Sequence, residues 1–456
     1  MRAVHFYEDN WMKPGIIFII CFACFFIACE GSNNDNGNHN SSTQSAQVLY
    51  QKDPTIACQA TLLAETQPFR YQRNVKSMID NNQLHLAYFL PAGNGNYNIH
   101  YLNFDWASLP QKNAGYNSSV IQVDHSRDMQ IGYTTDTIPI IMYQGGSYPT
   151  CGETEQSDIM LSLFQNNQWR EHTISIGTVE RNPVINNGLA GYSTDMIIDS
   201  TNTIHMCFQF LYEGCDSMNY NYPDLWYIQF STDNLNELPE HEIVEGNDYE
   251  NSNKQNNAGE HCSISLDNSN RPFIFYYYVD SLPNKEKGLR VAYRNYQDSW
   301  EAQWIVKDIH VDYISAKWND NQEIMAVAYY VTQNSYGNRN NVLMYAEQTY
   351  TGWQSIVVDK SCYCGKYCSL TFDNNGEPII AYRADQTRSG IALNQLKIAY
   401  RKSNQWKKYF CSTVNNIDNL GIDNTIHVDD DAIHITSFSY ETYGIYLITI
   451  QTEDIE

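Results

Sequence analysis

Basic residues are scarce in this chain. Of its 456 residues, 28 are Lys or Arg and 52 are Asp or Glu, so the formal net charge at pH 7 is −24. A body this acidic repels nucleic-acid phosphates and anionic lipid headgroups, and the sequence has no basic cluster that would act as a local exception. We therefore expect no nucleic-acid partner.

Long apolar runs and linkers between domains are missing as well. The apolar segment 16–28 is shorter than the ~20 residues that a membrane-spanning helix needs. No Pro-, Gly- or Ser-rich linker divides the remaining chain, although its length of about 400 residues exceeds an ordinary single core. Helical periodicity of useful length is absent too. These absences favour one repeat architecture over two or three separate domains.

The chain opens with a targeting segment. Met12 and Lys13 begin a short basic region, the apolar segment follows, and Phe26-Ile27-Ala28-Cys29 resembles the bacterial lipobox. The resemblance implies lipidation of Cys29 and a body outside the cytoplasm; an uncleaved anchor helix is the alternative. We predict a signal peptide over 1–28, with Met12 as the true translation start. A flexible polar tether over 29–56 and one folded domain over 57–456 follow.

A degenerate repeat fills the predicted domain. The segments CSISLDNSNRPFIFYYY from Cys262 and CSLTFDNNGEPIIAYR from Cys368 share one pattern: a short strand, an Asp, a turn with Pro, and an apolar strand that ends in aromatic residues. Further copies lie roughly 50 to 70 residues apart, which gives seven in all. Each copy has a second half, and in four copies a Trp opens its final strand: Trp169, Trp300, Trp353 and Trp406.

Each copy reads as four short strands joined by Asn, Asp and Gly turns, which is typical of a propeller blade. The sequence therefore predicts an all-β fold, a seven-bladed β-propeller with four antiparallel strands per blade. Six or eight blades are the alternatives if one weak copy is merged or split. The last copy lacks an outer strand, and we expect the segment near Cys58 to supply it and close the ring.

The blade pattern also predicts where a binding site would lie. Loops between the second and third strands are long and unlike one another, whereas the other hairpins are short and regular, so binding is expected on the face of the long loops. About six residues before each hairpin Asp, the inner strands begin around the entrance of the central channel. The predicted binding residues belong to this ring or adjoin it: Arg73, Arg127, Asp128, Asp195, His261, Asp312, Tyr313 and Tyr367.

The chain resembles the sialidase-like propeller superfamily. Its Trp turns stand where that family carries the Asp-box, Ser-x-Asp-x-Gly-x-Thr-Trp, of which mainly the Trp remains here. RNVKSMIDNNQLHLAY from Arg73 and YCSLTFDNNGEPIIAY from Tyr367 are similar to the segments that carry a carboxylate-binding Arg and the nucleophilic Tyr. His261 and Tyr313 stand near the places of the family's other arginines. This departure favours a relative without catalytic activity.

Metal sites have weak support. His85, His205 and His434 share one repeat position and would therefore lie in separate blades, where they cannot share an ion. The turn Asp429–Asp431 offers carboxylate oxygens that suit calcium, but it is also an ordinary blade turn. We expect no resident cofactor or metal ion, with calcium at this turn as the alternative.

Nine cysteines follow the lipobox. Outside the cytoplasm disulfides are the default, and an odd number leaves one thiol unpaired. Cys151 and Cys215 lie in long loops of adjacent predicted blades and are expected to pair. In Cys362–Cys368 (Cys-x-Cys-x3-Cys), local disulfides, one of them from Cys362 or its neighbours to Cys411, are favoured over a soft-metal site.

The leading functional prediction is a non-enzymatic binding or scaffolding module for a glycan or protein partner. It would be displayed on the bacterial cell envelope, in the periplasm or on the outer-membrane surface, and it would touch the membrane through its lipid alone. A monomer is expected. The alternative is a sialidase-type exo-glycosidase with Tyr367 and Arg73 in its site, which a trio of arginines around one pocket would favour.

Overall fold

The described residues form β-strands almost throughout. In this computed structural model they are residues 53–66, 75–80, 83–93, 96–105, 109, 116–123, 128–145, 158–175, 188–212, 223–235, 239–246, 256–280, 286–334, 339–387, 392–413, 417, 419–429 and 432–455. They all belong to the second of two units, 1–51 and 52–456. No helix among them is long and apolar enough to cross a membrane. The predicted signal peptide, Cys29 and most of the tether lie outside the described residues.

Five sheets contain four antiparallel strands each, in chain order. Their strands are β2 (Val75–Asp80), β3 (Gln83–Gly93), β4 (Asn96–Asp105) and β5 (Tyr116–Val123); β6 (Met129–Tyr133), β7 (Pro139–Gly145), β8 (Asp158–Gln165) and β9 (Gln168–Ser175); β10 (Gly188–Ile198), β11 (Thr203–Tyr212), β12 (Asp224–Ser231) and β13 (His241–Glu245); β14 (Asn256–Leu266), β15 (Pro272–Asp280), β16 (Lys287–Arg294) and β17 (Trp300–Lys307); and β18 (Ile309–Asn319), β19 (Ile324–Asn334), β20 (Arg339–Thr349) and β21 (Gly352–Asp359).

The sixth sheet has eight strands in the order β22-β23-β24-β25-β1-β28-β27-β26. Its strands are β22 (Cys362–Phe372), β23 (Pro378–Thr387), β24 (Ala392–Lys402), β25 (Gln405–Thr413), β1 (Thr55–Glu65), β26 (Ile422–Val428), β27 (Ala432–Ser439) and β28 (Gly444–Gln451), and a 3-10 turn, η2 (Thr452–Asp454), follows the last one.

Strand β1 joins the two halves of this large sheet. Its first residues, Thr55–Cys58, pair in parallel with β25, and Gln59–Glu65 pair antiparallel with β28. The N-terminal strand thereby supplies the outer strand that the last repeat copy lacks. The predicted pairing of the segment near Cys58 with the C-terminal strands is confirmed.

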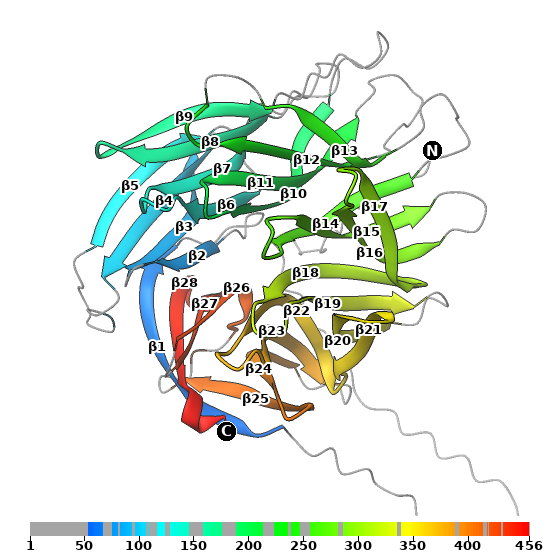
Figure 1. Cartoon of the computed structure of the whole chain (residues 1–456). Helices are drawn as coiled ribbons and strands as arrows, with labels where there is room; N and C mark the ends of the chain where they lie inside the picture. The colour runs from blue at the N-terminus through cyan, green and yellow to red at the C-terminus, as the bar shows by residue number, and fades with distance from the viewer. Residues whose placement is uncertain are drawn as a thin grey trace, which may run out of the picture. The chain divides into compact units, whose positions relative to one another are not determined.

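The sheets stand around a common centre (Figure 1), with the first strand of each set of four innermost. These inner strands contact one another in a closed cycle, β2-β6-β10-β14-β18-β22-β26 and back to β2. Hydrophobic clusters fill the interfaces between neighbouring sheets, and the second strands are largely buried, β7 along its whole length. The all-β architecture that the repeat predicts is confirmed.

The hairpin Asp of the repeat stabilises its own turn. The Oδ1 atom of Asp267 accepts hydrogen bonds from the backbone N–H groups two and four residues later, at 2.9 and 3.0 Å, and Asp373 does the same at 2.9 and 2.7 Å. A carboxylate in this position replaces a backbone acceptor, which is why Asp favours such turns. The turn residue with positive φ is Asn270 or Gly376, types that tolerate the left-handed region.

The repeated Trp residues join neighbouring sheets. Each lies on the fourth strand of its set of four and meets an aromatic ring of the preceding set edge-on, with ring centroids 5.1 to 5.4 Å apart. Edge-to-face pairs of this kind add stability beyond the area that they bury. The pairs are Trp169 with Tyr101, Trp300 with Tyr227, Trp353 with Phe275, and Trp406 with Tyr345. This packing explains why a Trp recurs at the same position in four copies of the repeat.

Candidate functional site

A cavity of about 530 Å³ lies at the centre of the ring. Residues from all the inner strands, β2, β6, β10, β14, β18, β22 and β26, line it. Five of the predicted binding residues are among them: Asp128, Asp195, His261, Tyr313 and Tyr367. The repeat therefore brings residues that are far apart in the sequence to one place.

Five inner strands carry the same β-bulge where they line the cavity. The register with the second strand shifts there, and one non-glycine residue in each bulge takes a left-handed backbone with φ between 47° and 55°. Such a backbone is strained for an L-residue, and bulges re-aim side chains next to functional sites. The five residues, all of which line the cavity, are Ser193, His261, Tyr313, Tyr367 and Asp423.

Side-chain oxygens link consecutive inner strands from β6 through β26. Asp128 Oδ2 accepts a hydrogen bond from the Thr194 backbone N–H at 2.8 Å, and Asp195 Oδ2 accepts from the N–H of Ile264 at 2.9 Å. Three serines continue the series by accepting from the following strand: Ser263 from Ala316, Ser315 from Leu370, and Ser369 from Ile426.

This series changes the interpretation of two predicted binding residues. The other carboxylate oxygens of Asp128 and Asp195 accept backbone N–H groups of Met129 and Met196. Burial raises the pKa of both carboxyl groups, while the nearby Lys76 opposes the shift. Asp128 and Asp195 thus link neighbouring inner strands, because their oxygens accept hydrogen bonds from the backbone of the next strand.

His261 lies at the cavity wall, in contact with a carboxylate. Its Nε2 lies 3.2 Å from Asp312 Oδ1 and its side chain is 34% exposed. Burial alone would lower the pKa of His261, but the hydrogen bond and charge of Asp312, with Glu260 and Asp128 beyond it, raise the pKa above its ordinary value. Asp312, which also contacts His310 at 3.1 Å, is therefore a positioning residue behind the cavity.

Tyr313 and Tyr367 extend this wall across two further sheets. Their rings lie 4.5 Å apart between centroids, and Tyr313 lies 6.0 Å from the His261 ring. The three side chains come from β14, β18 and β22, which are consecutive around the ring. The cavity thus has an aromatic wall with a histidine at one end.

Two cavity residues were missed by sequence reasoning. Asp423 lies six residues before the hairpin Asp429, the repeat position that His261 and Tyr367 occupy in their own copies. When the last copy is aligned from residue 424, the alignment begins one position too late and omits Asp423. Lys76 carries no repeat signal, because the other inner strands have no Lys at that place.

Arg73 and Arg127, the two arginines of the predicted site, lie outside the described residues, as do Cys151 and Cys215. Of the predicted calcium turn only Asp429 is described. Its Oδ1 accepts a hydrogen bond from the backbone N–H of Ala432 at 2.8 Å, and its Oδ2 lies 2.9 Å from His434 Nε2. Both oxygens of this carboxylate therefore already serve the hairpin.

The three histidines at one repeat position lie on three different strands, β3, β11 and β27, each in its own set of four. His85 and His205 each place Nδ1 2.6 Å from a tyrosine hydroxyl on the neighbouring strand, Tyr101 and Tyr227. These are cross-strand contacts of one recurring kind, as the separate-blade interpretation predicts.

The cysteine triplet pairs within itself. Cys362 forms a disulfide with Cys364, and Cys368 is free. The expected bond from this triplet to Cys411 is not formed. Cys411 is a free, buried cysteine beside Cys58, whose neighbouring thiol together with burial raises the pKa of Cys411. The N-terminal strand β1, rather than the triplet, faces it.

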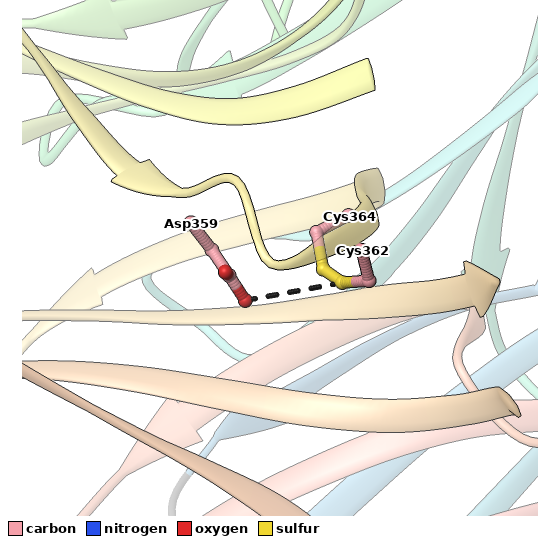
Figure 2. A group of neighbouring side chains, drawn as sticks. All are labelled: Asp359, Cys362 and Cys364. Carbon is pink, nitrogen blue, oxygen red and sulfur yellow. Dashed lines mark hydrogen bonds between the residues drawn. A yellow bond between two sulfur atoms is a disulfide. The ribbon is translucent and has the colours of Figure 1, made fainter. Parts of the chain in front are cut away.

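Asp359, Cys362 and Cys364 lie close together, with ligand atoms within 4.8 Å of one another (Figure 2). Their chemistry does not fit a resident metal ion. The two sulfurs are bonded to each other, and the Asp359 carboxylate is ion-paired with the buried Lys397 and with Lys408. Two ammonium groups on one carboxylate would repel a cation at that place.

No protein-family model and no curated protein matches the chain. Among solved structures, polysaccharide lyase Uly1 superposes with a TM-score of 0.54 at 9% identity, over 86% of this chain and 92% of that one. A Hadza microbial sialidase (TM-score 0.45, 10% identity, 79% of this chain and 74% of that one) and a Penicillium chrysogenum alpha-L-arabinanase (0.45, 10%, 87% and 99%) are also similar. The chain therefore has an all-β, propeller-type fold, which it shares with the polysaccharide lyase.

Proposed function

We propose that this chain is an envelope-anchored lipoprotein whose propeller binds a glycan in its central cavity without cleaving it. In this proposal the eight-stranded sheet counts as two blades joined by β1, which makes seven blades in agreement with the seven repeat copies. Residues 1–28 are the signal peptide, and 29–56 carry the lipid on Cys29 and the tether.

The recurring bulge is the observation that carries the proposal. Strained left-handed residues persist only where the surrounding structure holds them, and they gather at ligand sites. Here they present His261, Tyr313 and Tyr367 to one cavity. Aromatic side chains offer an apolar face with a polar edge, which suits the apolar face and hydroxyl rim of a sugar ring.

Two basic side chains of the cavity, His261 and Lys76, favour an acidic sugar. Asp128 and Asp195 also line the cavity, but backbone N–H groups bind their carboxylate oxygens. Asp312 raises the pKa of His261, which favours the charged form of the imidazole, and Lys76 lines the same cavity from β2. A carboxylate on the ligand would form charge-assisted hydrogen bonds with these donors. Asp423 limits this attraction at one side of the cavity and would accept a hydroxyl group instead.

A panel of oligosaccharides tests the proposal. Matched neutral and carboxylate-bearing saccharides are titrated calorimetrically into the purified chain, with product analysis after long incubation. We expect saturable binding of at least one acidic saccharide, weaker binding of its neutral counterpart, and unchanged saccharide at the end. Failure of every saccharide to bind would overturn the proposal.

A second candidate is a glycan-cleaving enzyme of the sialidase type. It is favoured by Tyr367, which the family resemblance identifies with the nucleophile and which lines the cavity beside Tyr313. Against it, Lys76 is the one Lys or Arg among the described residues that line the cavity, so the described part of the lining contains no arginine.

The Tyr367→Phe variant separates the two candidates. It keeps the aromatic face and removes the phenolic oxygen that a nucleophile needs. Release of a monosaccharide or of an unsaturated uronate by the wild-type chain, abolished in Tyr367→Phe, would establish the enzyme. Binding retained in Tyr367→Phe without turnover in either protein supports the binding module.

A further inference from the structure

Two cysteines face each other across one joint between sheets. Cys207 on β11 and Cys262 on β14 place their Sγ atoms 3.2 Å apart, and both side chains are buried. They belong to one hydrophobic cluster with residues of both sheets. A disulfide bond has S–S of ~2.05 Å, so these atoms are about 1 Å from bonding distance.

The interface between the β18–β21 sheet and β22 is equivalent, but it has one cysteine, Cys368, instead of two. Cys262 donates to the backbone carbonyl of Ser193, and Cys368 donates to that of Tyr313; both acceptors are bulge residues of the preceding inner strand. Cys207 pairs with Asp195 in its sheet as Ala328 pairs with Ser315. The thiol of Cys207 therefore corresponds to the methyl group of Ala328 at the equivalent interface.

We propose that Cys207 and Cys262 form a disulfide that locks the joint between the β10–β13 and β14–β17 sheets directly behind His261. The two thiols lose two protons and two electrons to a disulfide oxidant, such as oxidised glutathione, by two successive thiol–disulfide exchanges through a mixed disulfide. The oxidant is released as two thiols.

The bond forms during folding rather than afterwards. Burial raises the pKa of both thiols, so in the closed joint neither is a ready thiolate. The joint is open to the oxidant only before the two sheets pack. Once formed, the bond holds the backbone of the β14 bulge, in which Cys262 follows His261 directly.

Differential thiol labelling tests this proposal independently of where the chain resides. The full chain is refolded in a mixture of reduced and oxidised glutathione, denatured and alkylated with one reagent, then reduced and alkylated with an isotopically heavier one. We expect the heavy label on Cys207 and Cys262 and the light label on Cys368, the internal control. The light label on both Cys207 and Cys262 would overturn the proposal.

Two variants sharpen the result. Cys207→Ala makes this joint resemble that of Ala328 with Cys368; Cys262 should then take the light label, and the melting temperature under oxidising conditions should fall by at least ~2 °C. Ala328→Cys creates the second thiol at the equivalent joint, and Cys368 should change from the light to the heavy label. If it stays light in a folded variant, the geometry of these joints does not support a bond.

Discussion

His261 and Asp312 contact each other at 3.2 Å across two neighbouring inner strands, β14 and β18, at the wall of the central cavity. Because Asp312 raises the pKa of His261, the imidazole keeps its proton at a pH where a free histidine loses it. The cavity thus contains a histidine that favours its cationic form more than a free histidine does.

Affinity for an acidic saccharide should therefore depend on pH. A group whose pKa is raised in the folded protein keeps its charge above the ordinary value of ~6.5 and loses it as the pH rises through the folded-state pKa. Affinity should be constant below about pH 6.5 and decrease as the pH rises through the folded-state pKa of His261. Asp312→Asn should move this decrease to lower pH. Calorimetric titrations across this range check it. Affinity independent of pH in both proteins would contradict a role for the imidazolium.

The second prediction concerns Asp195, whose role in the structure is to link strands. Asp195→Ser keeps a hydrogen-bond acceptor of the kind that Ser263 and Ser315 supply, so the free energy of unfolding should change by less than about 1 kcal/mol. Asp195→Ala leaves the Ile264 N–H without this acceptor and should cost about 1–3 kcal/mol. Chemical denaturation measures both. A large loss of ligand affinity in a stable Asp195→Ser variant would restore Asp195 to the binding residues.

The third prediction concerns the start of β1. The buried Lys397 ammonium contacts Asp359 and lies 2.7 Å from Asp53, just before β1. Removing it in Lys397→Met leaves the buried Asp359 carboxylate with only the more distant Lys408, 3.5 Å away, which should destabilise the chain by up to about 3–5 kcal/mol. Asp53→Asn, which removes the less buried partner, should cost less. Equal and small losses in both variants would show that the pair does not hold β1.

Asp359 adds a pH dependence to this site. Burial would raise its pKa, but Lys397 and Lys408 lower it to about 2. Its contribution to stability is therefore complete above the unfolded-state value of ~3.9 and is lost as the pH falls toward 2. In Lys397→Met this part of the acid destabilisation should be smaller, as urea midpoints between these pH values would show.

The fourth prediction concerns His85. Burial lowers its pKa to about 4, and its ring is 3% exposed beside the Tyr101 hydroxyl. Between pH ~6.5, the unfolded-state pKa, and about pH 4, the unfolded chain binds a proton that the folded chain does not. The free energy of unfolding therefore decreases by up to about 3 kcal/mol as the pH is lowered through this range. His85→Gln should flatten this slope. A slope equal to that of the wild type would show that His85 titrates normally.

The sequence predicts the fold better than the chemistry of the site. Copies such as those at Cys262 and Cys368 repeat turn residues and aromatic positions, and these local signals fix strands and hairpins. The same alignment brings His261, Tyr313 and Tyr367 together. The alignment does not distinguish a side chain that faces the cavity, such as Tyr367, from one whose oxygens bind the next strand, such as Asp195. Both residues occur at or beside a bulge.

Contacts between distant segments were the other gap. Cys411 lies opposite β1, which is more than 340 residues away in the chain, and nothing in the spacing of the triplet excludes a bond to it. Cys207 and Cys262 occupy different repeat positions, so the alignment gives no reason to pair them. Their proximity follows from the packing of one sheet on the next.

The central claim is that the cavity wall of His261, Tyr313 and Tyr367 binds an acidic glycan, and one set of titrations tests it most directly. An acidic saccharide that binds the wild-type chain is titrated into Tyr367→Ala and His261→Ala, with Tyr350→Ala at a fully exposed hairpin tip as the control. We predict at least tenfold weaker binding for the first two, equivalent to about 1.4 kcal/mol, with melting temperatures close to wild type and no change for the control. Wild-type affinity in both cavity variants would contradict the account and place the binding site elsewhere.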